Sequence, residues 1–294
     1  MDLWQHIKNT FKTGSMLTRL IYANLAVFVA VLLTELVLFF MNQGFENPII
    51  EYGQIPSDLN LLLKRPWTIL SYMFMHKGFL HILFNILWLF WMGQIFLQYL
   101  SGKKLLSVYI LGGFSGALLY LIAYNTIPVF TNTLGVMIGA SASVYAVTFA
   151  IAFYVPNFTL RLLLIGEVKL KYIAIVPLII FDILRFTDGN YGGKIAHIGG
   201  AIFGFLFIYQ YKKGIDITRW FENITNWISD VFKPKPKMKV SYSGNAKDLD
   251  QTFRDKKAYN QKEIDRILDK ISKSGYNSLS KDEKETLFKL SENK

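Results

Sequence analysis

The chain has 294 residues, of which 52% are hydrophobic and 18% are charged, and its formal net charge at pH 7 is +11. A soluble domain of this size normally carries more charge and interrupts its apolar runs more often, so this composition argues against a soluble globular protein. The chain contains no cysteine, which excludes both a disulfide framework and a thiolate metal site.

The N-terminal segment, residues 1–19, precedes the first long apolar run and has two readings that we weigh equally. Its apolar residues share one helical face with two lysines nearby, which suits a helix lying on the membrane surface. A frayed terminus fits equally well. The residues concerned are Leu3, Trp4, Ile7, Lys8, Phe11 and Lys12.

Long apolar runs then predict membrane-spanning helices, because a bilayer core about 30 Å thick requires roughly 20 mostly apolar residues of helix. Four runs meet this length, and two more, one containing Pro177 and one rich in glycine, are acceptable as packed inner helices. We therefore expect an all-α, polytopic bundle of six spans within residues 20–213. The expected spans are residues 20–41, 79–100, 105–124, 134–155, 172–184 and 195–211.

The first and second spans are joined by residues 42–75. A loop of this length is uncommon unless it has a function or a fold of its own. Its apolar leucines indicate that it lies against the membrane interface.

The basic residues are distributed in a way that predicts topology rather than binding to nucleic acid. With the N-terminus in the cytoplasm, the inside segments carry more lysine and arginine than the outside loops, which is the positive-inside pattern and places both termini in the cytoplasm. The inside group includes Arg19, Lys103, Lys104, Arg161, Lys169, Lys171, Lys212 and Lys213, and the outside group includes Lys64, Arg65, Arg185 and Lys194.

The C-terminal part divides into an interfacial segment with a Lys/Pro linker, residues 214–240, and a small cytoplasmic helical tail, residues 241–294. Trp220 and Trp227 mark the amphipathic stretch, and Lys-Pro repeats from Lys233 predict an extended linker. In the tail, apolar residues at helical spacing end at Gly275, a plausible C-cap, and Ser280 with Glu283 forms a capping-box pattern. The tail is either a module for a cytoplasmic partner or a solvated extension.

Four polar side chains lie where a lipid-embedded helix would not normally carry them, and polar groups within spans are candidates for function. Spans two, four and six each run from outside to inside, and His81, Asn85, Ser141 and His197 each lie early in one of them. These four groups are therefore expected at similar depth in the outer half of the bilayer.

Their chemistry suits acyl transfer. A serine hydroxyl needs a neighbouring base, and His197 is the histidine available to Ser141. His81 and Asn85 are four residues apart on one helical face, where donors can stabilise an oxyanion. Tyr145, one turn after Ser141, is placed to pack against an imidazole. No carboxylate is evidently positioned to orient His197, and Asp182 is expected to pair with Arg185, so the residues predict a dyad.

Three motifs resemble those of the rhomboid family of intramembrane serine proteases, in its bacterial form. They are Gly139-Ala140-Ser141-Ala142 followed by Tyr145, His81-Ile82-Leu83-Phe84-Asn85, and Ala196-His197-Ile198-Gly199-Gly200 followed by Gly204. Their order, spacing and apolar setting agree over residues 67–213.

This resemblance implies hydrolysis of peptide bonds within or beside transmembrane segments of membrane proteins, without a cofactor or metal, in a bacterial inner membrane. It further implies that Ser141 is the nucleophile, His197 the base, and His81, Asn85 and the Ser141 amide the oxyanion donors, with Tyr145 and Gly139 supporting the dyad.

The sequence departs from the family pattern at two positions. Thr68 follows Trp67 where relatives often have arginine, which puts the anchoring of the first loop in doubt, and Ala142 replaces a frequent glycine. The main alternative is a catalytically silent relative that binds membrane-protein clients. A metal or haem site at His76 and His81 is disfavoured because five residues separate them. A transporter is disfavoured because Glu35 and Asp182 are the only acids at membrane depth.

Overall fold

The computed structural model describes residues 5, 10–11, 13–42, 47–131, 133–162, 165–232 and 246–291. The chain forms two compact units, Met1–Lys233 and Pro234–Lys294. Of the residues that suggest either an N-terminal surface helix or a frayed terminus, only Phe11 is described, and the Lys/Pro linker lies outside the described residues.

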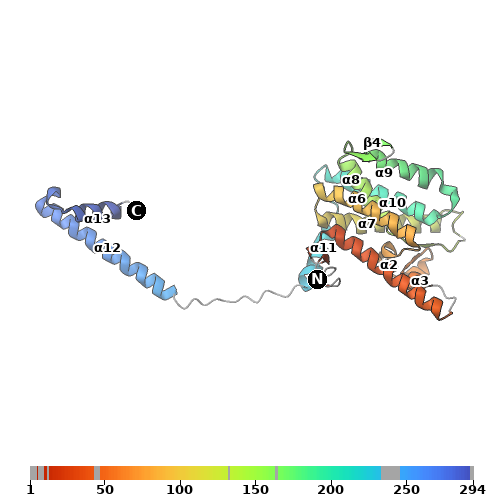
Figure 1. Cartoon of the computed structure of the whole chain (residues 1–294), viewed down its shortest axis with the longest axis horizontal. Coiled ribbons are helices and arrows are strands. Elements are labelled where there is room, and N and C mark those ends of the chain that lie inside the picture. The colour runs from red at the N-terminus through yellow and green to blue at the C-terminus, as the bar shows by residue number, and fades with distance from the viewer. Residues whose placement is uncertain are drawn as a thin grey trace. The chain divides into compact units, whose positions relative to one another are not determined.

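Six apolar helical segments of the first unit lie at the six predicted positions and form a bundle (Figure 1). Within the described residues, four are long and apolar enough to cross a membrane: α2 (Met16–Phe40), α6 (Phe79–Tyr99), α7 (Gly102–Thr126) and α10 (Tyr191–Tyr211). The other two are α8 (Ser141–Tyr154) and a continuous segment made of α9 (Leu170–Pro177) and the π-helical η2 (Leu178–Leu184). The predicted helical membrane fold is therefore confirmed.

The fourth segment starts later than predicted, because the helix expected over residues 134–155 begins only at Ser141. The preceding residues are extended: β2 (Val136–Met137) pairs antiparallel with β1 (Ile55–Pro56), and Gly139 has a φ of +125°. A helix of 14 residues is only about 21 Å long, which is less than the hydrocarbon thickness. The residues after α8 lead into a charged hairpin, which places the C-terminal end of α8 near a membrane surface. Because α8 is too short to reach the other surface, its N-terminal end falls within the apolar layer.

Helices α7, α8 and α10 form the centre of the bundle and contact one another through small residues. A Cβ on Gly200 would lie 2.0 Å from the carbonyl oxygen of Ala142, and one on Gly204 would lie 2.1 Å from that of Ala146. On α7, a Cβ on Gly112 would meet the Ala146 side chain at 2.1 Å. The backbones therefore approach as closely as glycine allows, which is how helices associate in lipid.

The first loop has a fold of its own, as its length predicts. Its elements are α3 (Pro48–Gly53), β1, α4 (Leu59–Lys64), α5 (Thr68–Ser71) and the 3-10 helix η1 (Tyr72–Phe74). Arg65 anchors it by donating to the Glu51 carbonyl at 3.2 Å and by lying over the Tyr52 ring at 4.2 Å. Thr68 is fully buried and donates to the Arg65 carbonyl at 2.7 Å, so the loop is anchored with threonine at this position.

A second short antiparallel sheet, which the sequence did not predict, joins α8 to α9. Its strands are β3 (Thr159–Leu162) and β4 (Gly166–Lys169), and Gly166, at the start of β4, has a φ of +85°. The sheet carries Arg161, Glu167 and Lys169, which suits a polar surface of the membrane domain rather than its core.

After α10, the chain enters α11 (Arg219–Phe232), whose amphipathic character agrees with the sequence. Buried Lys104, on the first turn of α7, forms ion pairs with Asp216 and with Glu222, the latter at 2.7 Å. These pairs tie the start of α11 to the membrane helices. One face of α11 is apolar and exposed, formed by Trp220, Ile224, Trp227, Ile228 and Val231.

The second unit is a helical hairpin of α12 (Ala246–Ser274), the 3-10 turn η4 (Tyr276–Ser278) and α13 (Lys281–Ser291). Gly275 ends α12 with a φ of +75°, and its N–H donates to the Ile271 carbonyl at 2.8 Å, as the C-cap prediction requires. The predicted capping box is also present, because the Glu283 carboxylate accepts from the Ser280 N–H at 2.8 Å and the Glu283 N–H donates to the Ser280 hydroxyl at 3.2 Å.

The contact of α10 with α8 leads to a stability prediction. We expect Gly200→Ala to destabilise the folded protein by on the order of 3 kcal/mol, because the added methyl must push two backbones apart. Ile202→Val, a change at an exposed residue of the same helix, is the matched control. Thermal unfolding in detergent measures both variants. Equal stability of Gly200→Ala and wild type would contradict the close backbone approach.

Candidate active site

Ser141 lies at the first residue of α8, where the chain changes from extended to helical. The change depends on Gly139: its φ of +125° is strained for any other residue, and a Cβ there would lie 2.8 Å from His81 Nε2. The first N–H groups of a helix have no partner within the helix, so the start of α8 presents backbone donors beside the Ser141 hydroxyl. Non-helical backbone at membrane depth is tolerated where it is buried in protein or lines a cavity.

The structure brings Ser141 and His197 into direct contact. His197 lies on α10, and its Nε2 is 2.7 Å from Ser141 Oγ, a distance typical of a strong hydrogen bond. The close packing of α10 on α8 at Gly200, three residues after the histidine, holds the two side chains at this separation. The pair thus has the geometry of a nucleophile and its base.

His197 has a second polar partner, and here the sequence-based expectation was wrong. The Asp182 carboxylate, on η2, lies 2.7 Å from His197 Nδ1 through Oδ1 and accepts from the Tyr145 hydroxyl at 2.8 Å through Oδ2. Arg185, the expected partner of Asp182, instead pairs with Asp188 at 2.7 Å. The expected pair, three residues apart, assumed an α-helix. Residues 178–184 instead form π turns, whose i→i+5 hydrogen bonds change which side chains share a face.

Tyr145 also contacts the imidazole directly. Its ring stacks on that of His197 with centroids 4.7 Å apart and planes 12° from parallel. The imidazole is therefore held by Ser141 at one nitrogen, by Asp182 at the other, and by an aromatic ring against its face.

His81 and Asn85, from α6, lie on the other side of Ser141. The position of His81 Nε2 near Gly139 places this ring beside the start of α8. Asn85 is buried, and its side-chain amide donates to the His81 carbonyl at 2.8 Å, which leaves its second N–H for another acceptor.

His76, for which the sequence suggested no role, supports this region from the loop before α6. It is fully buried, and its Nδ1 lies 3.1 Å from the Phe74 carbonyl, while its Nε2 lies 3.5 Å from the Ala140 N–H. Burial lowers the pKa of His76 to about 4, so the ring is neutral at pH 7 and one nitrogen can accept a hydrogen bond.

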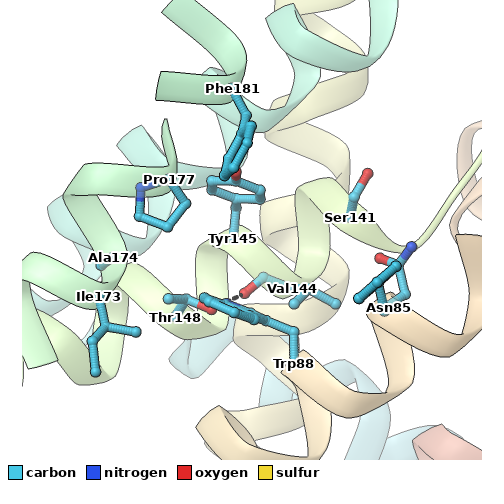
Figure 2. Close-up of a pocket in the computed structure, with 11 residues that line it drawn as sticks. Asn85, Trp88, Ser141, Val144, Tyr145, Thr148, Ile173, Ala174, Pro177 and Phe181 are labelled. Carbon is cyan, nitrogen blue, oxygen red and sulfur yellow. Dashed lines mark hydrogen bonds between the residues drawn. The ribbon is translucent and has the colours of Figure 1, made fainter. Parts of the chain in front are cut away.

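Two cavities open onto Ser141 and share Phe84, Asn85 and Ser141 in their walls. The first, of about 250 Å³, lies between α6, α8 and the α9–η2 segment and is mostly apolar. Figure 2 shows its walls: Asn85 and Trp88 from α6, Tyr145 and Thr148 from α8, and Pro177 and Phe181 from the third side. The second, of about 510 Å³, includes Lys77, His81, Asn190 and His197 in its wall. One cavity is thus suited to an apolar segment and the other to water or polar backbone.

The described part of the chain contains no group of three or more histidine, cysteine or acidic side chains arranged around a possible ion.

Fold and site together define a class: a polytopic helical membrane protein with a serine–histidine pair inside its bundle. The family model described as Rhomboid domain matches residues 63–213, and the chain therefore belongs to the rhomboid family. It is accordingly an integral membrane protein. A second model, described as a family of unknown function (DUF6576), matches residues 247–293, within the C-terminal unit.

Two curated relatives carry the same family name. "Rhomboid-related protein 1" of Caenorhabditis elegans is 31% identical over 163 residues, which are 49% of this chain and 39% of that protein. "RHOMBOID-like protein 12, mitochondrial" of Arabidopsis thaliana is 27% identical over 224 residues, which are 72% of this chain and 62% of that protein. The chain thus spans less than two thirds of the length of either relative.

Proposed function

We propose that the chain is an intramembrane serine endopeptidase that cleaves peptide bonds within or beside transmembrane segments of membrane proteins. The observation that carries this proposal is the 2.7 Å contact between Ser141 Oγ and His197 Nε2 at the wall of two cavities inside a membrane bundle. Membership of the rhomboid family supports the proposal, because the matched range, residues 63–213, contains both Ser141 and His197.

The proposed reaction begins with attack of Ser141 Oγ on the carbonyl carbon of the substrate. His197 Nε2 accepts the hydroxyl proton and later transfers it to the leaving amine, and water then hydrolyses the acyl-enzyme. The carbonyl oxygen becomes negatively charged, and His81, Asn85 and the Ser141 N–H are the proposed donors to it.

The two cavities fit the two needs of such a reaction. Hydrolysis requires water in a setting from which lipid excludes it, and the cavity that includes Lys77 and Asn190 in its wall offers polar contacts. The apolar cavity beside Pro177 and Phe181 suits the side chains of a transmembrane substrate. We propose the α9–η2 segment as the side from which such a substrate enters.

We expect Ser141→Ala and His197→Ala each to abolish cleavage, and the double variant to be hardly worse than either single one, because the two residues act as a unit. The measurement is cleavage of a generic transmembrane substrate by the purified protein in detergent. Ser143→Ala is a matched control, since Ser143 is buried in the same helix two residues later, outside both cavities.

The outcome separates the protease from a silent relative that binds membrane clients. Cleavage by wild type and by Ser143→Ala, but not by Ser141→Ala, is the result expected for the protease. Binding of the substrate without cleavage by wild type, unchanged in Ser141→Ala, would favour the client-binding alternative.

His81→Ala and Asn85→Ala are expected to weaken turnover without eliminating it. Loss of one oxyanion donor typically lowers kcat by about 10²–10³-fold, whereas substrate binding changes little. Phe90→Leu, at an exposed position of the same helix outside both cavities, serves as control. A residue whose replacement left kcat unchanged would not be a donor.

For localisation, we propose a bacterial inner membrane with both termini in the cytoplasm. The bacterial membrane follows from the resemblance to the bacterial form of the family, and the orientation rests on the excess of lysine and arginine in alternate connections of the bundle. In this orientation the proposed catalytic groups lie in the outer half of the bilayer, and the C-terminal unit is free to bind a cytoplasmic partner.

We expect a chain ending near Lys233 to retain cleavage, because all the proposed catalytic groups lie before Lys213. The rate per folded protein should match that of the full chain, with size-exclusion chromatography as the test of folding. A well-folded but inactive truncation would mean that the C-terminal unit is coupled to the site and would contradict our division of the chain.

A further inference from the structure

Asp182 is a buried carboxylate in an otherwise apolar segment of the membrane domain. It is 3% exposed and is the one buried residue of η2, whose other side chains are apolar and face outward or are only partly covered. An acidic group at membrane depth is expensive, and apolar burial would have been the less costly way to pack η2. The position of a carboxylate here therefore indicates a role beyond packing.

The burial of Asp182 is not explained by an ion pair, because the nearby cations Arg185 and Lys194 bind other groups. Arg185 is exposed and pairs with Asp188. Lys194, on the first turn of α10, donates to the carbonyls of Arg185 and Phe186, where it ties the end of η2 to α10. Both carboxylate oxygens of Asp182 instead reach His197 and its stacking partner Tyr145.

This contact determines which nitrogen of His197 holds the proton. An ionised carboxylate can only accept hydrogen bonds, so at 2.7 Å the Nδ1 of His197 must be the donor. Neutral imidazole then keeps its lone pair on Nε2, where the Ser141 hydroxyl lies. When Nε2 takes the serine proton, the imidazolium that forms lies next to a negative charge.

We propose that Asp182 is the positioning residue of His197, so that this member of the family operates a Ser141–His197–Asp182 triad rather than a dyad. The inference rests on the proposed function and deepens it. As Ser141 Oγ bonds to the carbonyl carbon, its proton passes to Nε2 and the carbonyl π electrons move to the oxygen. Asp182 stays ionised and gains no proton.

Asp182 belongs to the α9–η2 segment, which forms one wall of the apolar cavity. Pro177 and Phe181, five residues and one residue before Asp182 in the chain, line that cavity together with side chains of α6 and α8. A displacement of η2 that widens the cavity therefore also withdraws Asp182 from His197. Turnover then requires η2 to move back until Asp182 again contacts His197. Occupation of the cavity is thereby linked to the hydrogen bonding of the imidazole.

The experiment compares the full chain in detergent with Asp182→Asn, Asp182→Ala and Asp188→Asn. Asn is nearly isosteric with Asp but can present its amide donor to Nδ1 and so stabilise the wrong tautomer. We expect Asp182→Asn to lower kcat by about 10²–10⁴-fold with little change in KM. Asp188→Asn is the matched control, since it removes an exposed acid six residues later. Wild-type kcat in both Asp182 variants would overturn the proposal.

A second readout does not depend on turnover. In protein labelled with ¹⁵N-histidine, the chemical shifts of His197, assigned by its loss in His197→Ala, report which nitrogen is protonated. We expect the Nδ1–H tautomer in wild type and in Asp188→Asn, and a shift toward Nε2–H in both Asp182 variants. An unchanged tautomer would overturn the positioning role.

The two readouts separate failure of this inference from failure of the proposed function. Absence of cleavage by wild type together with a tautomer that depends on Asp182 would reject the protease but support the positioning role. Normal cleavage that depends on Ser141, with no effect of Asp182 on kcat or tautomer, would support the protease and reject the triad.

Discussion

The close approach of α10 to α8 is the constraint on which the rest of the structure depends. Because lipid is as apolar as the helices, it gives them no hydrophobic reason to associate, and packing of small residues must hold them together. At Gly200 the Ala142 carbonyl occupies the space that a side chain would need. Three residues earlier on α10, the same approach sets the 2.7 Å distance from His197 to Ser141. Stability and site geometry therefore share one contact.

The late start of α8 is a second feature on which the site depends. A continuous helix over residues 134–155 would satisfy its own backbone but would leave no free N–H groups beside Ser141. The positive φ of Gly139 ends the extended segment, and the helix then begins within the apolar layer. Polar groups exposed there must find partners, and the loop residue His76, the pairing of β1 with β2 and the cavity walls supply them.

Much of this was predictable from the sequence because the signals are local or periodic. Apolar runs located the helical segments, and the motif residues Ser141 and His197 lie where the structure joins them. The contact of Asp182 with His197 was not predictable, since it joins residues on two helices and depends on π turns that no spacing rule announces. The hairpin of β3 and β4 was missed for a related reason, because a short polar connection between spans carries no strong strand pattern.

The two sides of the apolar cavity differ in how they are held, and this difference bears on how the site works. Helix α8 is buried along most of its length and is fixed by backbone contacts with α10. Segment η2 buries only Asp182, and the bonds that hold it to the bundle are polar ones, from Asp182 to His197 and from Lys194 to carbonyls at its end. Elements with few buried apolar contacts open at the lowest free energy. Ser141, the proposed nucleophile, thus lies on the side of the cavity that backbone contacts fix, whereas Asp182, the proposed positioning residue of His197, lies on the side with few buried apolar contacts. Under the proposed entry of substrate at this side, a displaced η2 separates Asp182 from His197, and the imidazole regains this partner only when η2 returns.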